Sequence, residues 1–280
     1  MFTNRKDATL VENLSATRAI MPLLMQTKTE AQVFFKQEID VTQTMRFVDA
    51  WNEANPGQRI TLFHVYMWAL GAAFHERPRM NRFISGGRIY QRKGVFLSFA
   101  AKKKKLDDEA ALVTIKRELP QGASLSQVAE LLNADIKSGR SDAVRPEDRE
   151  LALTQRLPQF MVRLGLWAMR LADRFNLLPQ SVIAHDPCWS SMFVANLGSL
   201  GMEAAYHHLY EWGNCPFFAT LGVTKEVHTP HGIRLVATVK YTFDERIDDG
   251  LSCARALDVL KQRVEAPAKY EAIPQAAKAA

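Results

Sequence analysis

The sequence predicts an α/β protein, because strand-like and helix-like segments follow one another along most of the chain. Alternating polarity, typical of half-buried strands, marks residues 32–41 and 233–241. Helical signals mark residues 42–54, 62–75 and 251–264. With 280 residues, the chain is long enough for one large domain or two small ones.

The first third of the chain supplies most of these segments. We expect residues 1–17 to form an N-terminal arm, and a helical pattern starts at Arg18. Thr42 is a good N-cap for the helix that follows the first strand. The strongly apolar helix that comes next is expected to stop near Pro78. Strand signals then return in two short segments, at residues 87–90 and 94–99.

Composition excludes some classes of protein and leaves others open. Apolar residues make up 47% and charged residues 24%, as in an ordinary globular core, and the net charge of +6 suits several kinds of anionic partner. No aromatic and basic residues interleave as in a nucleic-acid surface, so we expect no nucleic-acid partner. Three scattered cysteines without metal-ligand spacing predict no metal site and a reducing, cytoplasmic location. No signal peptide and no apolar run of about 18 residues is found.

A polar turn joins the last strand signal to the last helix. It reads Tyr-Thr-Phe-Asp-Glu-Arg-Ile-Asp-Asp-Gly over residues 241–250, and polar residues at a strand end are a common way to build a site. This segment resembles the D-H-R-x-x-D-G signature of the dihydrolipoamide acyltransferases, the acyl-transferring cores of 2-oxoacid dehydrogenase complexes and relatives of the chloramphenicol acetyltransferases. Glu245 stands where that family has its catalytic histidine, and the matching residues are Asp244, Arg246, Asp249 and Gly250.

Other motifs in the same order strengthen the resemblance. Residues 38–42 and 78–81 are similar to the family at the corresponding places. The family's S-N-L-G-x-x-G, N-x-P and L-G stretch is similar to residues 196–201, 214–216 and 221–222.

The resemblance implies an α/β two-layer sandwich, with a chloramphenicol acetyltransferase-like mixed sheet and flanking helices. It covers roughly residues 18–262, so we expect a core domain at 18–264 and a C-terminal tail at 265–280. It also implies a homotrimer with the active-site channel between subunits, from which a larger cage can assemble. Its ligand would be CoA or acyl-CoA, with no covalent cofactor. Because no lipoyl domain is expected here, an acyl group would come as a CoA thioester or on a separate acyl carrier.

Two groups that the family's chemistry needs are exchanged in this sequence. Acyl transfer between thiols needs a base and a hydrogen-bond donor for the oxyanion. The resemblance places the base at Glu245 and the donor hydroxyl at Ala195, whose side chain donates no hydrogen bond. A thiol titrates near ~8.5 and a glutamate near ~4.3, so proton transfer to Glu245 is uphill by about four pH units unless burial raises its pKa. Losing one oxyanion donor costs about 10²- to 10³-fold in rate.

Two functions therefore stay open. In the first, the protein has lost His-dependent transfer and acts as a trimeric scaffold, or binds CoA thioesters or acyl chains. In the second, it is an active CoA-dependent acyltransferase with a rebuilt site, whose candidate catalytic residues are Glu245, His207, His208 and Asn196.

The turn at residues 241–250 also has an architectural interpretation. The resemblance implies that Asp249 pairs with Arg18 and thereby holds the turn. A buried aspartate without its partner costs about 3 to 5 kcal/mol. On this view Asp244 and Arg246 are kept for structure as well, and Glu245 has no chemical role.

A run of four lysines departs from the family pattern after the strand at 94–99. Lysine runs are usually solvated loop residues. The alternative is that Lys103 and Lys104 bind the phosphates of a CoA-like ligand.

Residues 141–190 are longer than the family core needs. Within them, residues 158–178 predict an added amphipathic helix, which we expect to cover the core or to make a subunit contact. The alternative is a helix that lies on a membrane surface or closes over an acyl chain. Its apolar stripe comprises Phe160, Leu164, Trp167, Leu171 and Phe175, and a second stripe comprises Arg163, Arg170 and Arg174.

Overall fold

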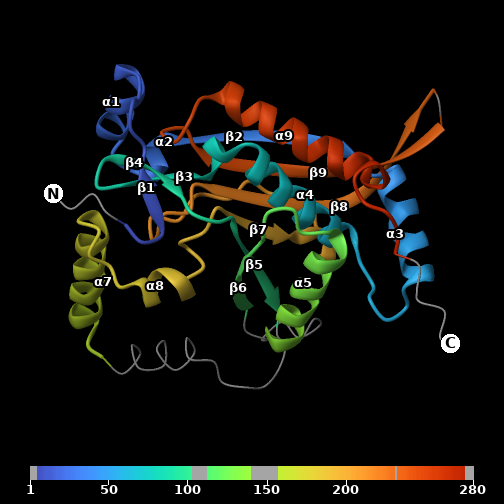
Figure 1. Ribbon diagram of the computed structural model, residues 1–280, viewed down its shortest axis with the longest axis horizontal. Helices are drawn as coiled ribbons and strands as arrows, with labels where there is room; N and C mark the ends of the chain where they lie inside the picture. The colour runs from blue at the N-terminus through green and yellow to red at the C-terminus, as the bar shows by residue number, and fades with distance from the viewer. Residues whose placement is uncertain (1–4, 103–111, 140–156, 231, 275–280) are drawn as a thin grey trace.

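A mixed six-stranded sheet is the largest element of the computed structural model, which describes residues 5–102, 112–139, 157–230 and 232–274 (Figure 1). β7 runs parallel to β5 and β8, whereas the other neighbouring strands are antiparallel. The strands lie in the order β2 (Gln32–Asp40), β9 (Gly232–Asp244), β8 (Phe217–Thr229), β7 (Met192–Asn196), β5 (Phe96–Lys102) and β6 (Leu112–Glu118).

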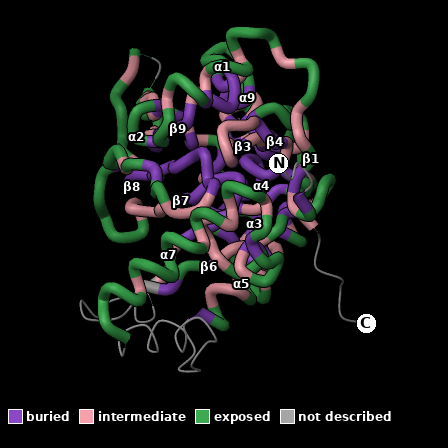
Figure 2. Tube along the Cα trace, turned by 90° about the vertical axis from the view of Figure 1, so that its left-hand side faces the viewer, coloured by how far each residue is buried: buried purple, intermediate pink, exposed green. Residues whose placement is uncertain are grey.

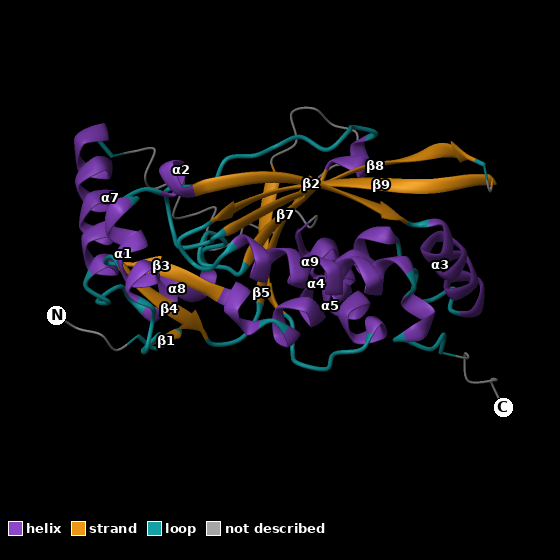
Figure 3. Cartoon of the chain, turned by 90° about the horizontal axis from the view of Figure 1, so that it is seen from above, coloured by secondary structure: helices purple, strands orange, loops and turns teal. Residues whose placement is uncertain are grey.

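Helices cover one face of this sheet (Figure 3). The central one, α4 (Leu62–Glu76), packs against α3 (Thr42–Ala54), α5 (Leu125–Gly139) and α9 (Gly250–Glu265). This position explains why the α4 sequence is apolar all round, since only a helix with neighbours on every side can bury such a surface. The predicted α/β class, mixed sheet and flanking helices are confirmed.

A smaller part of the chain forms one end of the molecule (Figure 1). There a three-stranded antiparallel sheet has the order β1-β4-β3, so the expected N-terminal arm contains a strand that pairs with β4. The β8–β9 hairpin projects at the opposite end. The elements of the small end are β1 (Ala8–Leu10), α1 (Ala16–Leu24), α2 (Lys28–Ala31), β3 (Arg82–Ser85), β4 (Arg88–Arg92), α7 (Gln159–Arg174) and α8 (Gln180–His185).

The hydrophobic core lies between the large sheet and its helices, where the buried residues concentrate (Figure 2). Aromatic side chains join the two layers: Phe74 of α4 meets Phe217 of β8 edge to face, with ring centroids 5.9 Å apart. The buried Tyr66 hydroxyl of α4 donates to the Tyr241 hydroxyl of β9 at 3.3 Å, so even the polar atoms here are paired across the layers.

Two details of the sequence prediction are corrected. Thr42 is the first residue of α3 and not its N-cap, which is Val41. The Thr42 hydroxyl instead accepts a hydrogen bond from the Leu235 amide at 2.9 Å and ties α3 to β9. Covering the core is also wrong as a role for α7, because none of its residues is buried. Among the described residues, no helix is long and apolar enough to cross a membrane.

The turn after β7 fits tightly against β8. It is the short 3-10 helix η2 (Leu197–Leu200), which follows Asn196. A Cβ added at Gly198 would lie 2.6 Å from the carbonyl oxygen of Gly222, which is backbone and cannot move aside. Gly222 itself lies beside a β-bulge between Leu221 and Thr224. The glycines of the two sequence motifs are therefore needed for close approach of one backbone to another.

We expect Gly198→Ala to destabilise the protein by about 1 to 3 kcal/mol, the usual cost of overpacking. The matched control is Gly165→Ala on α7, where nothing lies within 4 Å of the added methyl group and stability should be unchanged or higher. Urea denaturation of both variants checks the difference. Equal midpoints for the two variants would contradict this account of the turn.

Candidate functional site

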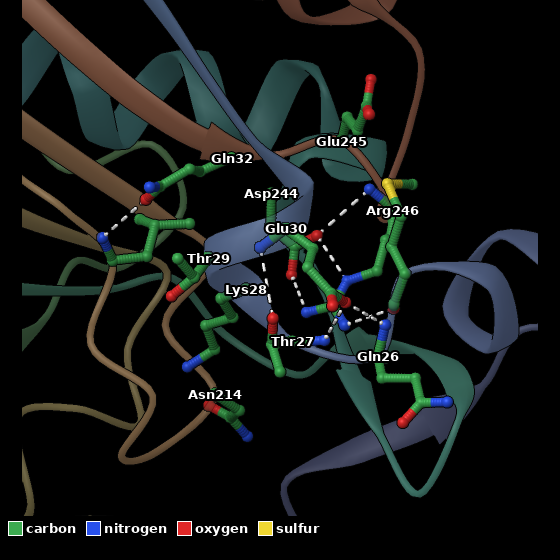
Figure 4. Close-up of polar contacts among 12 residues, drawn as sticks. Gln26, Thr27, Lys28, Thr29, Glu30, Gln32, Asn214, Asp244, Glu245 and Arg246 are labelled. Carbon is green, nitrogen blue, oxygen red and sulfur yellow. Dashed lines mark hydrogen bonds and ion pairs between the residues drawn. The ribbon is translucent and has the colours of Figure 1, made fainter.

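The turn between β9 and α9 is built around a buried ion pair (Figure 4). The Arg246 guanidinium binds both carboxylate oxygens of Asp244, with Nε 2.8 Å from Oδ1 and Nη2 2.7 Å from Oδ2. The two side chains are 4% and 2% exposed. Arg246 Nη1 also donates to the carbonyl oxygen of Met25 at 3.0 Å, and so links the turn to the end of α1. Asp244 and Arg246 thus both make buried contacts within the protein.

The backbone of Glu245 is held from two sides. Its amide donates to the carbonyl oxygen of Ala31 at 3.0 Å, and its carbonyl oxygen accepts from Arg18 Nη1 at 2.7 Å. The Arg18–Asp249 ion pair expected from the sequence is therefore not formed. Asp249 is instead the N-cap of α9, where its carboxylate accepts from the Ser252 amide at 2.8 Å. A carboxylate at a helix N-terminus satisfies free amides and meets the positive end of the helix dipole.

Asp248 was not singled out by the sequence, yet it joins two of the motifs. Its Oδ1 accepts from the guanidinium of Arg79, which belongs to the motif at 78–81, and from the Asp249 amide at 2.9 Å. The sequence did contain a signal for this contact, because Arg79 lies in the motif at 78–81 that resembles the family. The turn and the residues at 78–81 are therefore one structural unit.

The carboxylate of Glu245 lies apart from this network. Its side chain is half-buried and points away from the Asp244–Arg246 pair (Figure 4). Within the described residues, no hydrogen bond or ion pair joins it to His207, His208 or Asn196. The Asn196 side chain is engaged in capping η2, with Oδ1 3.2 Å from the Ser199 amide. The candidate catalytic residues do not form one hydrogen-bonded cluster.

His207 has the properties of a neutral base. Its ring stacks on Phe218, with centroids 3.8 Å apart and an interplanar angle of 10°. Its Nδ1 lies 2.7 Å from the carbonyl oxygen of His208, and because a carbonyl only accepts, Nδ1 carries the proton and Nε2 keeps a lone pair. Burial lowers the pKa of His207 below its usual 6.5. His208 is exposed beside it, with the two rings 4.6 Å apart.

The sheet register relates His207 to Ala195, the position at which the resemblance predicts a hydroxyl. Phe218, under the His207 ring, is the partner of Phe193 across β7 and β8, and Ala195 is the partner of Thr220. Residues two apart on a strand share a face, so Ala195 lies on the face that carries His207. The Thr220 hydroxyl is already bound to the Ala205 carbonyl oxygen.

The comparisons with known proteins agree with this architecture. A family model described as 2-oxoacid dehydrogenases acyltransferase (catalytic domain) matches residues 6–150, which is more than half of the chain. The chain belongs to this acyltransferase family. No curated protein sequence matches it.

Solved structures show the same fold at low sequence identity. A probable dihydrolipoamide acetyltransferase from Listeria monocytogenes superposes with a TM-score of 0.59 and 15% identity, covering 94% of this chain and 97% of that one. Dihydrolipoamide acetyltransferase from Azotobacter vinelandii gives 0.58 and 16%, covering 93% and 94%. The cubic core of a pyruvate dehydrogenase multienzyme complex gives 0.56 and 15%, also covering 93% and 94%.

A cavity of about 260 Å³ lies beside the signature turn of this acyltransferase-family chain. Lys28 is buried at its wall, where Nζ donates to the carbonyl oxygens of Tyr210 and Gly213 at 2.7 and 2.8 Å. Burial lowers the pKa of Lys28. Sequence reasoning missed Lys28, because its acceptors are more than 180 residues away along the chain. Other lining residues are Arg170, Arg174, Trp189, Trp212 and Arg246.

Two predictions about binding groups stay untested. Lys103 and Lys104 lie outside the described residues, so their proposed contact with phosphates stays a prediction. In the described part of the chain, no group of three or more His, Cys, Asp or Glu side chains could hold a metal ion.

We expect Arg246→Met to lower the free energy of unfolding by about 3 to 5 kcal/mol, because it leaves the Asp244 carboxylate buried without its partner. The matched control is Glu245→Gln, one residue away, whose side chain has no polar partner among the described residues; its effect should stay within about 0.5 kcal/mol. Chemical denaturation measures both. A larger effect at Glu245 than at Arg246 would show that the ion pair does not hold the turn.

Proposed function

We propose that this chain is an acyltransferase-family protein that has lost His-dependent acyl transfer and binds CoA thioesters or their acyl groups. One observation carries the proposal: the polar groups of the signature turn bind the protein itself, while the reacting position bears the carboxylate of Glu245. Asp244, Arg246 and Asp249 are engaged in the ion pair and the helix cap. A carboxylate is a weak base toward a thiol, because their usual pKa values differ by about four units.

The alanine at position 195, where the resemblance predicts a hydroxyl, supports the same conclusion. The study of the Azotobacter vinelandii enzyme concerns the role of a serine, a histidine and an asparagine in its catalytic mechanism. The histidine and asparagine there are four residues apart, as are Glu245 and Asp249 here. With Glu245 at the histidine position and Ala195 at the hydroxyl position, neither the histidine nor the serine is kept at the place that the resemblance assigns.

The cavity beside the signature turn supports binding of an anionic ligand. Of its cationic lining groups, Lys28 and Arg246 are already bound to backbone carbonyls and to Asp244, so Arg170 and Arg174 are the groups that can meet the phosphates of CoA. The acidic residues that also line it are Asp173 and Glu211, and both already have protein partners. The net field in the cavity therefore favours an anion.

The second candidate function is CoA-dependent acyl transfer with His207 as the base. A specific observation favours it: the Nδ1–H of His207 is fixed by a backbone carbonyl, and its lowered pKa keeps Nε2 unprotonated near neutral pH. This is how a general base is held ready. The weakness of this candidate is the oxyanion, since the side chain of Ala195 offers no donor on the same face.

We expect acetyl-CoA and longer acyl-CoAs to raise the melting temperature without any release of free thiol above the rate in buffer. Thermal unfolding and a thiol-trapping assay measure the two effects on the full chain.

The variants Glu245→Gln, His207→Ala and His208→Ala distinguish the two functions, and exposed His208 is the matched control for His207. Thiol release that disappears in His207→Ala and persists in His208→Ala would establish the second candidate. The rate of thiol release should then rise with pH through the lowered pKa of His207. It should reach its plateau at a lower pH than a histidine with the usual pKa near ~6.5 would give. If acyl-CoAs cause no melting shift and no thiol is released, both candidate functions are contradicted.

We also propose that the chain forms a homotrimer. The sheet face opposite the helices carries exposed side chains on its edge strand β2, including Phe34 and Lys36, beside the exposed Tyr206. A structure of the same fold is the cubic core of a multienzyme complex. A sheet face with exposed aromatic side chains, here Phe34 with Tyr206 beside it, is typical of an interface between subunits.

Sedimentation equilibrium should give three times the mass of one chain, and Phe34→Asp should lower it, because a carboxylate would be buried in the interface. A monomeric wild-type protein would contradict the trimer, as would a trimer that Phe34→Asp leaves intact.

A further inference from the structure

Helix α7 is attached to the protein through its polar side. Asp173 Oδ1 accepts from Arg5 Nη1 at 2.9 Å, and the Asp173 carbonyl oxygen accepts from the Ser85 hydroxyl at 3.0 Å. Only Met169 and Ala172 of α7 pack into the small apolar cluster beneath it. Apart from these two, the apolar residues of α7 are not used for folding, and none of its residues is buried.

The apolar stripe of α7 faces the solvent. At 3.6 residues per turn, its centre lies about 160° around the helix from the stripe that contains Met169, Ala172 and Asp173. Figure 2 shows α7 as an exposed segment at the edge of the molecule. The exposed fractions along the stripe are Phe160 69%, Leu164 60%, Trp167 59%, Leu171 39% and Phe175 36%.

Arginines flank the stripe on one side. Arg163, Arg170 and Arg174 lie about 80° around the helix from its centre, near the border between the apolar and polar faces. The single acidic residue of α7 is Asp173, which belongs to the attached side and is paired with Arg5. The solvent-facing half of the helix therefore carries apolar and cationic groups without any anionic one.

This arrangement matches the surface of an anionic phospholipid bilayer. Helices that lie in a membrane interface combine an apolar face containing Trp, Phe and Leu with basic residues at the level of the headgroups. Each arginine near an anionic surface adds attraction, and tryptophan prefers the interface. α1 adds exposed apolar side chains, Ile20, Leu23 and Leu24, at the same end of the molecule (Figures 1 and 3).

A second copy of the chain fits this face less well. In a two-fold dimer, this face would bring Arg163, Arg170 and Arg174 of one copy toward the same three arginines of the other, and the chain already has a net charge of +6. In the proposed trimer, the subunit contact is assigned to the sheet face that carries Phe34. An acyl chain held under α7 is disfavoured as well, because the stripe points away from the side by which α7 is attached.

We propose that α7 is an interfacial helix that docks this protein onto an anionic phospholipid membrane. The apolar stripe from Phe160 to Phe175 inserts at the boundary between headgroups and acyl chains, and Arg163 at its border binds the lipid phosphates. Arg170 and Arg174, which also line the cavity beside the signature turn, add to the positive charge of this surface. The helix lies parallel to the bilayer plane, with Asp173 and Arg5 on the protein side.

Flotation of the full chain with vesicles tests the proposal. The protein should float with phosphatidylcholine–phosphatidylglycerol vesicles and only weakly with pure phosphatidylcholine. Leu164→Ser/Trp167→Ser should weaken binding to the anionic vesicles at least about tenfold. The matched control is Val227→Ser/Ile233→Ser, which removes two exposed apolar side chains from the hairpin at the other end and should leave binding unchanged.

Tryptophan fluorescence gives a second readout. All five tryptophans lie in the described part of the chain; Trp51, Trp68 and Trp189 are buried, Trp212 is half-buried, and Trp167 alone is exposed. Anionic vesicles should therefore shift the emission to shorter wavelength. Trp167→Phe should abolish that shift while the protein still floats.

Three results would overturn the proposal. The first is no flotation with anionic vesicles, and the second is flotation that the α7 double variant leaves unchanged. The third is an oligomer that forms without vesicles and that the α7 double variant dissociates, when the wild-type protein also fails to float. This result would assign the stripe to a contact with a second copy of the chain.

Discussion

The ion pair between Asp244 and Arg246 is the contact on which the rest of this structure depends. It is almost completely removed from solvent, and an unpaired charge at this depth would be strongly unfavourable. The guanidinium also reaches the end of α1, while Arg18 of that helix reaches back to the turn. Through these two arginines, the end of β9, the start of α9 and the N-terminal helix are held as one unit.

The contacts that hold the signature turn do not involve the side chain of Glu245. The ion pair and the helix cap that fix the turn form without the side chain of residue 245. If Glu245 occupies the family's histidine position, as we propose, the exchange leaves these contacts of the turn undisturbed. Reactivity can be lost at such a position, or taken over by His207 on the neighbouring face, with little effect on stability.

The sequence predicted the fold because its signals are local or shared with the family. Alternating polarity located β2 and β9, and the uniformly apolar run at 62–75 located α4. It could not predict the partner of Arg18, which is a backbone carbonyl whose direction depends on the dihedral angles of the turn. The burial of Lys28 was missed because its two acceptors lie on a distant loop without periodicity. Amphipathicity predicted the stripes of α7 but not which of them faces the protein.

The way in which α7 is attached lets its outer surface change in evolution without disturbing the fold. The helix contributes nothing to the main core and is secured largely by Arg5 and Ser85 through Asp173. Substitutions along its outer surface are therefore decoupled from folding, so natural selection can reshape that surface without any compensating change elsewhere. A helix attached in this way can diverge in sequence faster than the core of the same protein.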